Sequence, residues 1–378
     1  MNVALEFTYG IGSRSGIGRY VNRLARAFPG PLGEEDAVAL FFVDFFRAFS
    51  AGKVCPECAR DRRFSFHPAP RLPARVYERA WNLPGIRRLF PIAPRDADLV
   101  HIASHAAVPV AKRQRMVCTI HDMAAWRFPG HPALAKDRRA IRLNALRADA
   151  ILTDSRFSAG DIARYIPEAA GKIFPIHLGI DHETYRPASS SEIALMRKAL
   201  GLERPYVLSV GLVHPNKNPV FLGRVLEALG DRDIELCLAG SPSFGYGGIV
   251  AEMKSLRCAD RIRFLGHVDD RWLPALYSGA ACYATASRSE GFGFTPLEAM
   301  ACGTPVVSSS AGSLPEILGG AATLLKDEDV GQWSQELRRL LEDSAFRAGR
   351  IESAFAHARQ FTWARTAEET VARYRSVL

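Results

Sequence analysis

The chain alternates short apolar runs with helix-like patterns, and it does so in two successive series. This alternation is typical of parallel strands joined by crossover helices. The expected strands of the first series are Val3–Tyr9, Ala37–Val43, Leu99–Ile102, Met116–Ile120, Ala150–Thr153 and Ile173–Ile176. Those of the second are Tyr206–Val210, Ile234–Ala239, Ile262–Gly266, Ala281–Ala284, Val306–Ser308 and Ala322–Leu324. The expected helices include Gly18–Phe28, Pro132–Ala148, Ser155–Tyr165, Pro219–Leu229 and Trp272–Ser278.

Two such series in 378 residues predict two α/β domains of similar size. The polar, turn-rich stretch 182–191 is typical of a linker between them. Ligands of parallel sheets bind beyond the carboxyl ends of the strands, so we expect a ligand site in a cleft between the domains.

Positive charge is concentrated in the first half of the chain. Residues 1–190 hold 28 Lys and Arg against 18 Asp and Glu, whereas the rest holds 21 against 22. The excess is densest over 60–95, where nine arginines are interleaved with five aromatic residues. This composition favours peripheral contact with an anionic membrane surface. A solvated arginine-rich face and a nucleic-acid site are the alternatives, and we expect no nucleic-acid partner.

The cysteines and the amino-terminal sequence bear on the compartment. Seven cysteines, an odd number in a long chain, fit a reducing cytoplasm. The first ten residues have no basic region ahead of an apolar core and predict a strand, not a signal peptide. No apolar run approaches the roughly 20 residues of a membrane span. Cys55 and Cys58 form a lone CxxC, for which zinc or redox chemistry is a minor alternative.

The segment 287–312 places two carboxylates, Glu290 and Glu298, around a short turn. The turn consists of Gly291, Phe292, Gly293 and Phe294, and Thr295 follows it. We expect a helix to begin at Pro296 with Thr295 as its cap and with Glu298 in its first turn. Backbone N–H groups there can hold an anion while the carboxylates hold hydroxyls. A nucleotide sugar carries both kinds of group; the simpler alternative is that Glu298 only interacts with the helix dipole.

This segment resembles the Glu-x7-Glu signature of the retaining glycosyltransferases of family 4. The resemblance extends over nearly the whole chain and implies the GT-B fold, with two Rossmann-like α/β domains facing a central cleft. Residues 1–185 would form the acceptor-binding domain and 186–362 the nucleotide-sugar donor-binding domain. A last helix over 363–378 would cross back to the first. The resemblance also implies that Glu290 binds hexose hydroxyls and acts in catalysis, that Glu298 binds the ribose, and that the turn binds phosphate.

A glycine-rich loop follows the first expected strand and precedes a helix, so its backbone can approach a phosphate closely. A dinucleotide site is the alternative, with acids at 34–36 near the place of a ribose-binding acid, although the glycine spacing departs from that motif. The string 15–20, Ser-Gly-Ile-Gly-Arg-Tyr, is similar to the first-domain loop of the family. The resemblance implies that Gly16 contacts the donor diphosphate. It implies acceptor-side roles for Gly12, Arg14, Arg19 and Tyr20.

His121 and Asp122 follow the strand expected at Met116–Ile120 and therefore aim at the ligand edge of the sheet. A lone histidine is more often structural than catalytic, but members of the family carry His-Asp at this place. The resemblance implies that His121 contacts the donor hexose. Asp122 would orient it or face the acceptor hydroxyl.

The loop after Tyr206–Val210 begins at Gly211 and contains Lys217, a point charge suited to a diphosphate. Many relatives carry arginine just after the glycine or just before the lysine, where this chain has Leu212 and Asn216. We therefore expect the leaving charge to rest on Lys217, with His214 or Arg288 as candidate helpers. By resemblance, the nucleotide base would lie against His267 and Val268.

No metal site is expected, because the DxD-like string 231–233 precedes a strand and has the composition of a turn. The resemblance also implies a metal-independent hexosyltransferase, in which Lys217 and helix N-termini stabilise the leaving diphosphate. A sugar-nucleotide 2-epimerase of the same architecture and a non-catalytic nucleotide-sugar-binding protein are the alternatives.

The glycine loop and the His-Asp pair look most like mannosyl- or rhamnosyltransferases of bacterial surface polysaccharides, lipopolysaccharide among them. A GDP-sugar is therefore favoured over a UDP-sugar as the donor, which is a substrate and leaves no separate cofactor. The acceptor would be a glycan or a lipid-diphosphate-linked glycan. These expectations place the protein in the cytoplasm, at the inner face of the cytoplasmic membrane.

Overall fold

The chain divides into two units, each with its own parallel sheet. A computed structural model describes residues 1–11, 16–42, 55–68, 93–105, 108, 110–127, 132–230, 233–326 and 328–378. Unit 1 comprises Met1–Gly179 and Trp363–Leu378, and unit 2 comprises Ile180–Thr362. The division therefore falls just before the stretch expected to be a linker, and the last helix belongs to unit 1.

Unit 1 contains a seven-stranded parallel sheet with the strand order β3-β2-β1-β4-β5-β6-β7. Its strands are β1 (Asn2–Glu6), β2 (Ala37–Phe42), β3 (Phe64–Pro68), β4 (Leu99–Ile102), β5 (Arg115–Thr119), β6 (Ala150–Thr153) and β7 (Ile173–Pro175). Its helices are α1 (Gly16–Ala27), α3 (Pro56–Arg60), α5 (Ala124–Arg127), α6 (Pro132–Arg147), α7 (Arg156–Tyr165) and α16 (Trp363–Val377), with 3-10 turns at Thr8–Gly10 and Pro167–Lys172.

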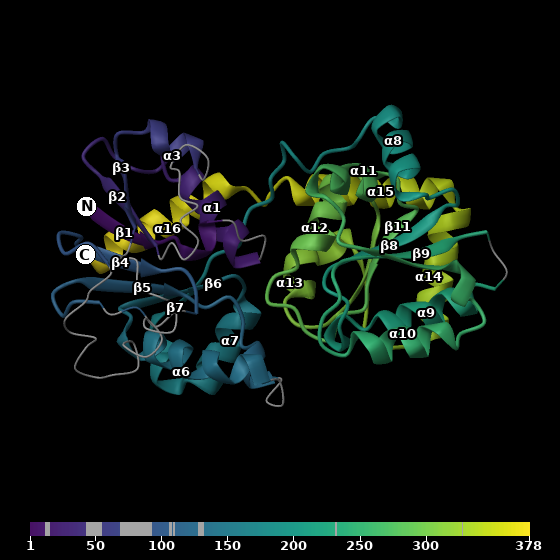
Figure 1. Cartoon of the computed structure of the whole chain (residues 1–378), viewed down its shortest axis with the longest axis horizontal. Coiled ribbons are helices and arrows are strands. Elements are labelled where there is room, and N and C mark those ends of the chain that lie inside the picture. Colours follow the sequence, from purple (N-terminus) through teal and green to yellow (C-terminus); the bar gives the residue numbers. More distant parts are fainter. Residues whose placement is uncertain are drawn as a thin grey trace. The chain divides into compact units, whose positions relative to one another are not determined.

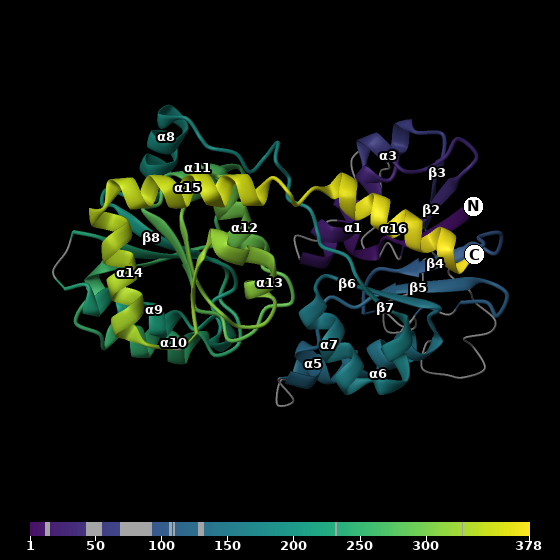
Figure 2. The same ribbon diagram turned by 180° about the vertical axis from the view of Figure 1, so that it is seen from behind.

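Helices cover both faces of this sheet (Figure 1). On one face, Ile141 of α6 and Ile162 of α7 pack in a core with Val100 of β4 and Ile151 of β6. On the other face lie α1 and α16, which in Figure 2 runs along the sheet in yellow. The central strands are buried on both sides, which explains why they are mostly apolar and do not alternate with polar residues.

Unit 2 contains a six-stranded parallel sheet with the order β10-β9-β8-β11-β12-β13. Its strands are β8 (Tyr206–Val210), β9 (Glu235–Ala239), β10 (Ile262–Gly266), β11 (Cys282–Thr285), β12 (Val306–Ser309) and β13 (Thr323–Leu325). Its helices are α8 (Ser190–Leu200), α9 (Pro219–Ala228), α10 (Tyr246–Lys254), α11 (Leu273–Ser278), α12 (Phe294–Ala301), α13 (Leu314–Leu318), α14 (Val330–Glu342) and α15 (Ser344–Ala358). The 3-10 turns are Pro215–Lys217, Ala259–Arg261, Asp270–Trp272 and Gly319–Ala321.

The helices of unit 2 also form two layers, with α9, α10 and α14 on one face of the sheet and α11, α12 and α15 on the other (Figure 1). Phe221 of α9 and Trp333 of α14 pack edge to face in the hydrophobic core of this unit, with 5.3 Å between ring centres. In both units the strand order reverses direction beside the first strand, between β1 and β4 and between β8 and β11. Ligands bind at such points, beyond the strand carboxyl ends.

The parallel α/β fold expected from the sequence is confirmed, and every expected strand is present within a few residues of its expected bounds. The strand β3 was not expected. Its residues lie in the basic stretch 60–95, of which 69–92 are outside the described residues. The expected linker also extends too far. Helix α8 begins at Ser190, inside that stretch, because Ser189 caps it through a capping box with Glu192.

Two further observations concern the cysteines and the membrane. Cys55 and Cys58 are joined as a disulfide at the start of α3, and both are buried. The remaining five cysteines are free and buried. Among the described residues, no helix is both long enough and apolar enough to span a bilayer.

Candidate active site

Two glycines bring the first loops of unit 2 into direct contact. Gly211 follows β8 and Gly240 follows β9; Gly211 donates to the Ala239 carbonyl at 2.9 Å, and Gly240 to the Gly266 carbonyl at 2.7 Å. A Cβ on Gly240 would overlap the carbonyl oxygen of Gly211. Gly211 itself has a φ of +141°, which favours glycine. The carboxyl ends of β8, β9 and β10 are therefore held close together by backbone contacts.

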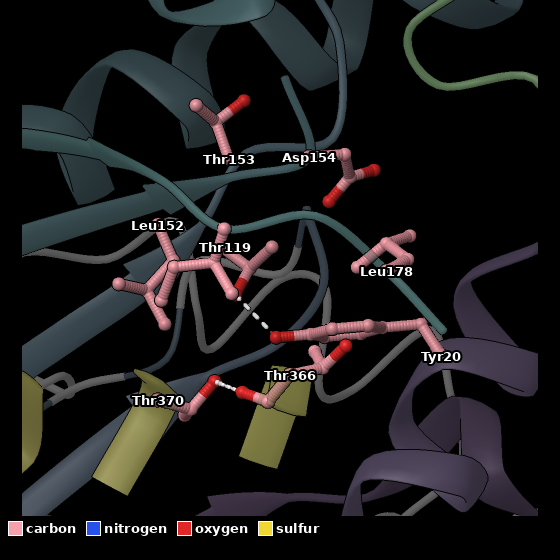
Figure 3. A pocket seen from close by; sticks show the side chains of 9 residues that line it. Tyr20, Thr119, Leu152, Thr153, Asp154, Leu178, Thr366 and Thr370 are labelled. Carbon is pink, nitrogen blue, oxygen red and sulfur yellow. Dashed lines mark hydrogen bonds between the residues drawn. The ribbon is translucent and has the colours of Figure 1, made fainter. Parts of the chain in front are cut away.

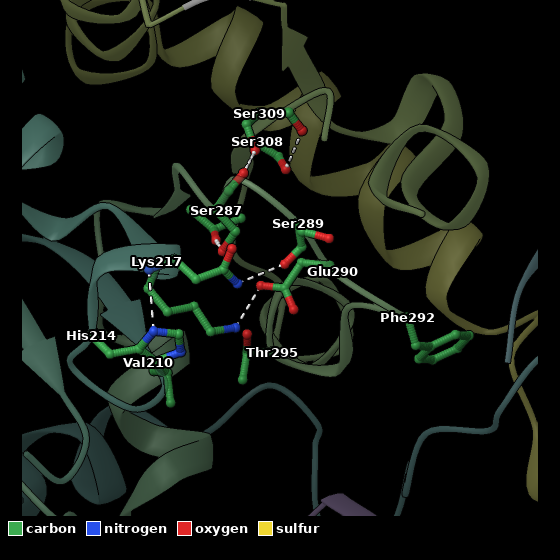
Figure 4. Close-up of polar contacts among 12 residues, drawn as sticks. Val210, His214, Lys217, Ser287, Ser289, Glu290, Phe292, Thr295, Ser308 and Ser309 are labelled. Atoms are coloured by element: carbon green, nitrogen blue, oxygen red, sulfur yellow. Dashed lines mark hydrogen bonds and ion pairs between the residues drawn. The ribbon is translucent and has the colours of Figure 1, made fainter. Parts of the chain in front are cut away.

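Lys217 and Glu290 form an ion pair at this edge (Figure 4). Nζ of Lys217 donates to Oε1 of Glu290 at 2.5 Å. The lysine side chain is 25% exposed and the glutamate 17%, so both remain within reach of a ligand. A Cβ on Gly211 would come within 3.4 Å of the Lys217 Cε, which means that the glycine leaves room for the lysine. The structure thus brings together two residues that lie far apart in the sequence.

Asn216 holds the loop that carries Glu290. Its side-chain Nδ2 donates to the Ser289 carbonyl at 2.8 Å, and its own carbonyl accepts from the Arg288 N–H at 2.8 Å. In the sequence this residue was notable only because relatives carry arginine there. The structure shows that the asparagine fixes the neighbouring loop.

The same loop is held from its other side by Gly312 and Ser313, which follow β12. The N–H and the hydroxyl of Ser313 both donate to the Glu290 carbonyl at 3.1 Å. Gly312 has a φ of +66°, and a Cβ there would lie 2.5 Å from the Glu290 oxygen. Glu290 is therefore anchored by backbone contacts from two directions, although no sequence pattern indicated Gly312 or Ser313.

The other cations considered from the sequence differ in orientation. His214 accepts the Asn216 N–H on Nδ1 at 3.1 Å, so its neutral ring carries the proton on Nε2. Arg288 binds Glu328 at 3.0 Å and is 55% exposed. Leu212, at the usual position of an arginine, is an exposed apolar side chain. Of these residues His214 lies beside Lys217 (Figure 4), whereas Arg288 is engaged with Glu328.

The start of α12 differs from the expectation. The helix begins at Phe294 with Gly293 as its cap, and Gly293 has a φ of +110°. Thr295 is inside the helix, and its hydroxyl accepts from the Tyr283 hydroxyl at 2.7 Å. Pro296 is tolerated because the first turn needs no backbone donor. The left-handed glycine cap outweighed the preference of threonine for that position.

Glu298 lies beyond the first turn of α12, so its expected position in that turn is wrong, and the alternative of a first-turn acid beside the helix dipole does not apply. The residue is only 2% exposed, and its Oε2 accepts from the Tyr277 hydroxyl at 2.8 Å. Burial and the neighbouring Glu298 carboxylate raise the pKa of Tyr277, which keeps the phenol protonated as a donor. Tyr277 is thus a support for Glu298 that the sequence did not reveal.

The remaining donor-side residues lie at the same edge of the sheet. His267 is exposed and Val268 is buried, and both follow β10 directly. In the turn, Phe292 is 4% exposed and packs against Phe294, with 5.1 Å between ring centres. Gly291 is partly buried between Glu290 and Phe292.

In unit 1, the residues expected on the acceptor side have different environments. Gly12 and Arg14 lie outside the described residues. Gly16 is exposed at the start of α1, and Arg19 is half-buried. Tyr20 is only 2% exposed, and its hydroxyl bonds with the Thr119 hydroxyl at 3.0 Å (Figure 3). Tyr20 is therefore a core residue, whose ring packs edge-on against His121 at 4.8 Å.

His121 and Asp122 lie just past the carboxyl end of β5. His121 Nδ1 bonds with Asp154 Oδ2 at 2.8 Å, and its Nε2 lies 3.3 Å from the Ala103 carbonyl. Asp122 accepts the Ala124 N–H at 2.8 Å and so holds the start of α5. Asp154 directly follows β6, the neighbour of β5. Because that strand was expected, the rule that carboxyl ends of parallel strands share one edge could have identified it.

A chain of buried, hydrogen-bonded polar side chains lies in the interior of unit 1, next to His121. His101 of β4 bonds with Thr119 at 2.7 Å and with the Tyr374 hydroxyl of α16 at 2.6 Å. Burial lowers the pKa of His101 to about 3, so this histidine is neutral.

Glu6, at the end of β1, has its pKa raised by burial, and it accepts the Thr8 N–H at 3.0 Å. The small pocket bounded by Tyr20, Thr119 and Asp154 (Figure 3) is too small for a ligand.

The dinucleotide alternative is not supported by the position of its acid. Asp36 precedes β2 and binds the amino group of Met1 at 2.9 Å and the Gly33 N–H at 2.8 Å. It therefore lies at the amino edge of the sheet, opposite the ligand edge. As for a metal, the described parts of the chain contain no group of three or more His, Cys, Asp or Glu side chains arranged to hold an ion.

Comparisons with known proteins cover both units. The family model "Glycosyltransferase Family 4" matches residues 14–184, and "Glycosyl transferases group 1" matches 193–357. O-antigen chain mannosyltransferase B of Escherichia coli is 31% identical over 69% of this chain and 70% of its own length. D-inositol 3-phosphate glycosyltransferase of Salinispora arenicola is 35% identical over 58% of this chain. The match spans about half of that relative, 53% of its length.

Solved structures agree on the fold. Anabaena Alr3699/HepE, determined in complex with UDP and glucose, is similar over 100% of this chain and 99% of its own, with a TM-score of 0.74 and 22% identity. WaaG, a glycosyltransferase involved in lipopolysaccharide biosynthesis, is similar over 99% of both chains, with a TM-score of 0.71 and 14% identity. With a parallel sheet in each unit, family models over both units and a mannosyltransferase relative over most of its length, the chain belongs to glycosyltransferase family 4 and has the GT-B fold.

Proposed function

We propose that this protein transfers a hexosyl group, mannose- or rhamnose-like, from a nucleoside diphosphate sugar to a hydroxyl of a glycan or lipid-linked acceptor. The transfer retains the anomeric configuration and needs no metal ion. The observation that carries the proposal is the ion pair between Lys217 and Glu290 beside the start of α12. A partly exposed cation next to a partly exposed acid suits a ligand that joins a diphosphate to a polyol.

Each residue of the donor site has a distinct task in this proposal. Lys217 neutralises the diphosphate, together with the backbone of the turn before α12. Glu290 accepts hydrogen bonds from the hexose hydroxyls. Glu298, fixed by Tyr277, serves the ribose, and the backbone around His267 and Val268 contacts the base. The leaving phosphate oxygen takes the proton of the acceptor hydroxyl, so no protein base is required.

The donor is expected to be a GDP-sugar. Support comes from the 31% identical relative, which is named a mannosyltransferase, whereas the HepE structures contain UDP and UDP-glucose. Because a ligand that binds only the folded state raises its melting temperature, GDP should raise the Tm more than UDP, ADP or dTDP. Differential scanning fluorimetry measures this ranking. A larger shift with UDP would overturn the donor assignment, and no shift with any of them would overturn the donor site.

Retention is tested by NMR of the product made from the identified donor. The anomeric coupling should show the configuration of the donor, because attack and departure occur on the same face of the sugar. The opposite anomer would refute retention. Incubation of the donor without any acceptor distinguishes transfer from epimerisation, since only an epimerase would then produce a new sugar nucleotide.

Peripheral contact with the inner membrane face also belongs to the proposal, with the basic stretch 60–95 as its surface. Arg63 is not part of that surface, because its guanidinium binds Asp61 at 2.6 Å and the Leu32 carbonyl at 2.9 Å. The other arginines of the stretch supply the charge. Sedimentation with vesicles should show binding to phosphatidylglycerol-containing membranes that weakens as salt rises. Equal binding to neutral phosphatidylcholine vesicles would contradict an electrostatic contact.

A further inference from the structure

Asp154 is a buried carboxylate at the ligand edge of unit 1 that the proposed mechanism does not use. Asp154 is 5% exposed, and its carboxylate oxygens Oδ2 and Oδ1 lie 2.8 Å and 3.1 Å from Nδ1 of His121. The side chain of His121 is 12% exposed and that of Asp154 is 7% exposed, so both are largely withdrawn from solvent. A buried carboxylate is costly unless it is paired, and this one has a histidine as its partner.

The second ring nitrogen of His121 also faces an acceptor. Nε2 lies 3.3 Å from the carbonyl oxygen of Ala103, which follows β4. A carbonyl oxygen can only accept, and an ionised carboxylate can only accept. Both contacts are therefore hydrogen bonds only when each nitrogen carries a proton, that is, when His121 is an imidazolium.

The charges around His121 favour this form. Burial opposes a charge on the ring, but the Asp154 carboxylate, with a smaller contribution from Asp122, outweighs it and raises the pKa of His121. On the β4 side the facing group is His101, which is neutral. On the α1 side it is the ring of Tyr20, whose pKa is raised by burial so that the phenol stays neutral. Burial also raises the pKa of Asp154 itself, and His121 opposes that rise by attraction and hydrogen bonding, with a smaller effect in the same sense from His105.

We propose that Asp154 is a positioning residue that keeps His121 doubly protonated and fixes its ring, so that His121 acts as a hydrogen-bond donor and not as a base. The contact to Ala103 is the longer of the two, and a hydroxyl oxygen of the sugar substrate can take the place of that carbonyl. The ligand chemistry is a sugar hydroxyl or ring oxygen, which accepts from Nε2.

A pH dependence follows from the direction of the shift. A histidine whose folded-state pKa is raised stabilises the fold below its ordinary value of about 6.5, and the contribution is lost as pH rises through the folded-state pKa. The donor form is lost over the same interval. Transfer should therefore decline on the alkaline side, whereas a base at this position would give a decline on the acidic side.

The direct test is long-range proton–nitrogen NMR of the full-length protein labelled at its ten histidines. The His121 signals are identified by their loss in H121Q. At pH 7 both ring nitrogens should be protonated, and in D154N the titration midpoint of His121 should fall by about one unit or more. A singly protonated ring at pH 7, or an unchanged midpoint in D154N, would overturn the inference. If D154N does not fold, the wild-type spectrum alone decides.

The matched control is D149N, at the opposite end of the same strand. Asp149 also accepts hydrogen bonds, from the Met116 N–H at 2.8 Å and from Arg115 at 3.1 Å, but it lies at the amino edge of β6. D149N should leave the His121 titration unchanged. A similar drop in both variants would show a general loss of structure and would contradict a specific role for Asp154.

The kinetic test rests on the proposed function. D154N should lower kcat about 10- to 100-fold, as expected for loss of a hydrogen bond to a charged group, and D154E should restore part of it. The KM for the donor should change little, because the proposed diphosphate site at Lys217 is in unit 2. Unchanged kcat in D154N would refute the positioning role. If the NMR result holds and no transfer is found with any donor, the proposed function fails while the assignment of Asp154 stands.

Discussion

Replacing Glu290 with glutamine should lower kcat about 100- to 1000-fold, the range seen when a group that stabilises a transition state is removed. Glutamine keeps the shape and one acceptor oxygen, but it removes the charge that holds the Lys217 ammonium at 2.5 Å. The lysine would then lose its fixed position, and the hexose would lose an ionised acceptor. Steady-state kinetics with the donor identified by thermal shift measure the effect.

The melting temperature of E290Q should stay close to that of the wild type, since the backbone of Glu290 is held by Ser313 independently of its side chain. The control is E328Q, which removes the charge from a half-exposed acid paired with Arg288. An exposed pair is worth little, so E328Q should keep near-normal turnover. Near-normal turnover in E290Q would remove Glu290 from the mechanism.

Replacing both Lys217 and Glu290 should have a non-additive effect on kcat. If Glu290 acts partly by placing Lys217, the double variant K217M/E290Q should be little worse than the more damaged single variant. Residues that act together are non-additive in this way. Fully additive losses would show that the two side chains work separately and that their ion pair has no part in catalysis.

Replacing Gly240 with alanine should destabilise unit 2 by about 3 kcal/mol or more, at the upper end of the range for overpacking. The added Cβ would overlap the carbonyl oxygen of Gly211, which is backbone and cannot rotate away. Either the loop after β8 or the loop after β9 must move, and Lys217 lies on the first of them. For a unit of this size the melting temperature should fall by roughly 6–12 °C.

The control for that change is Gly247→Ala, in the first turn of α10. A Cβ at Gly247 meets nothing within 4 Å, and alanine is the better helix former by about 1 kcal/mol. G247A should therefore be as stable as the wild type or slightly more so. Thermal unfolding followed by circular dichroism compares the two variants. If G240A has the same melting temperature as the wild type, the close approach of the two loops does not exist in solution.

The strands and the ligand edge were predictable from sequence because buried parallel strands are largely apolar runs with polar residues after their ends. The runs Leu99–Ile102 and Ala150–Thr153 were located to the residue. The edge strand β3 was missed because its half-exposed residues lie among arginines and have no such run. A strand at the edge of the sheet is partly solvated, so its sequence lacks the apolar run that burial requires of a central strand.

The supports of the site were much less predictable. Asn216, Ser313 and Tyr277 act through contacts with residues distant in the sequence, and none belongs to a local pattern. Local rules also failed where the backbone took an unusual conformation, as at Gly293, which displaced Thr295 from the cap position. The candidate reactive residues of this fold follow strand ends and can be predicted, whereas the residues that hold them depend on tertiary contacts.

The return of α16 to unit 1 has a consequence for the order of events during synthesis. Tyr374 and Thr366 complete unit 1 by bonding with His101 and the His177 carbonyl, but a ribosome releases them only after all of Ile180–Thr362. Unit 2 is continuous, and its ends are adjacent, since Ile180 pairs with Thr362. Unit 2 can therefore fold while the chain is still being made. Unit 1, although its sheet emerges first, cannot cover the part of its face on which α16 packs until translation has passed unit 2.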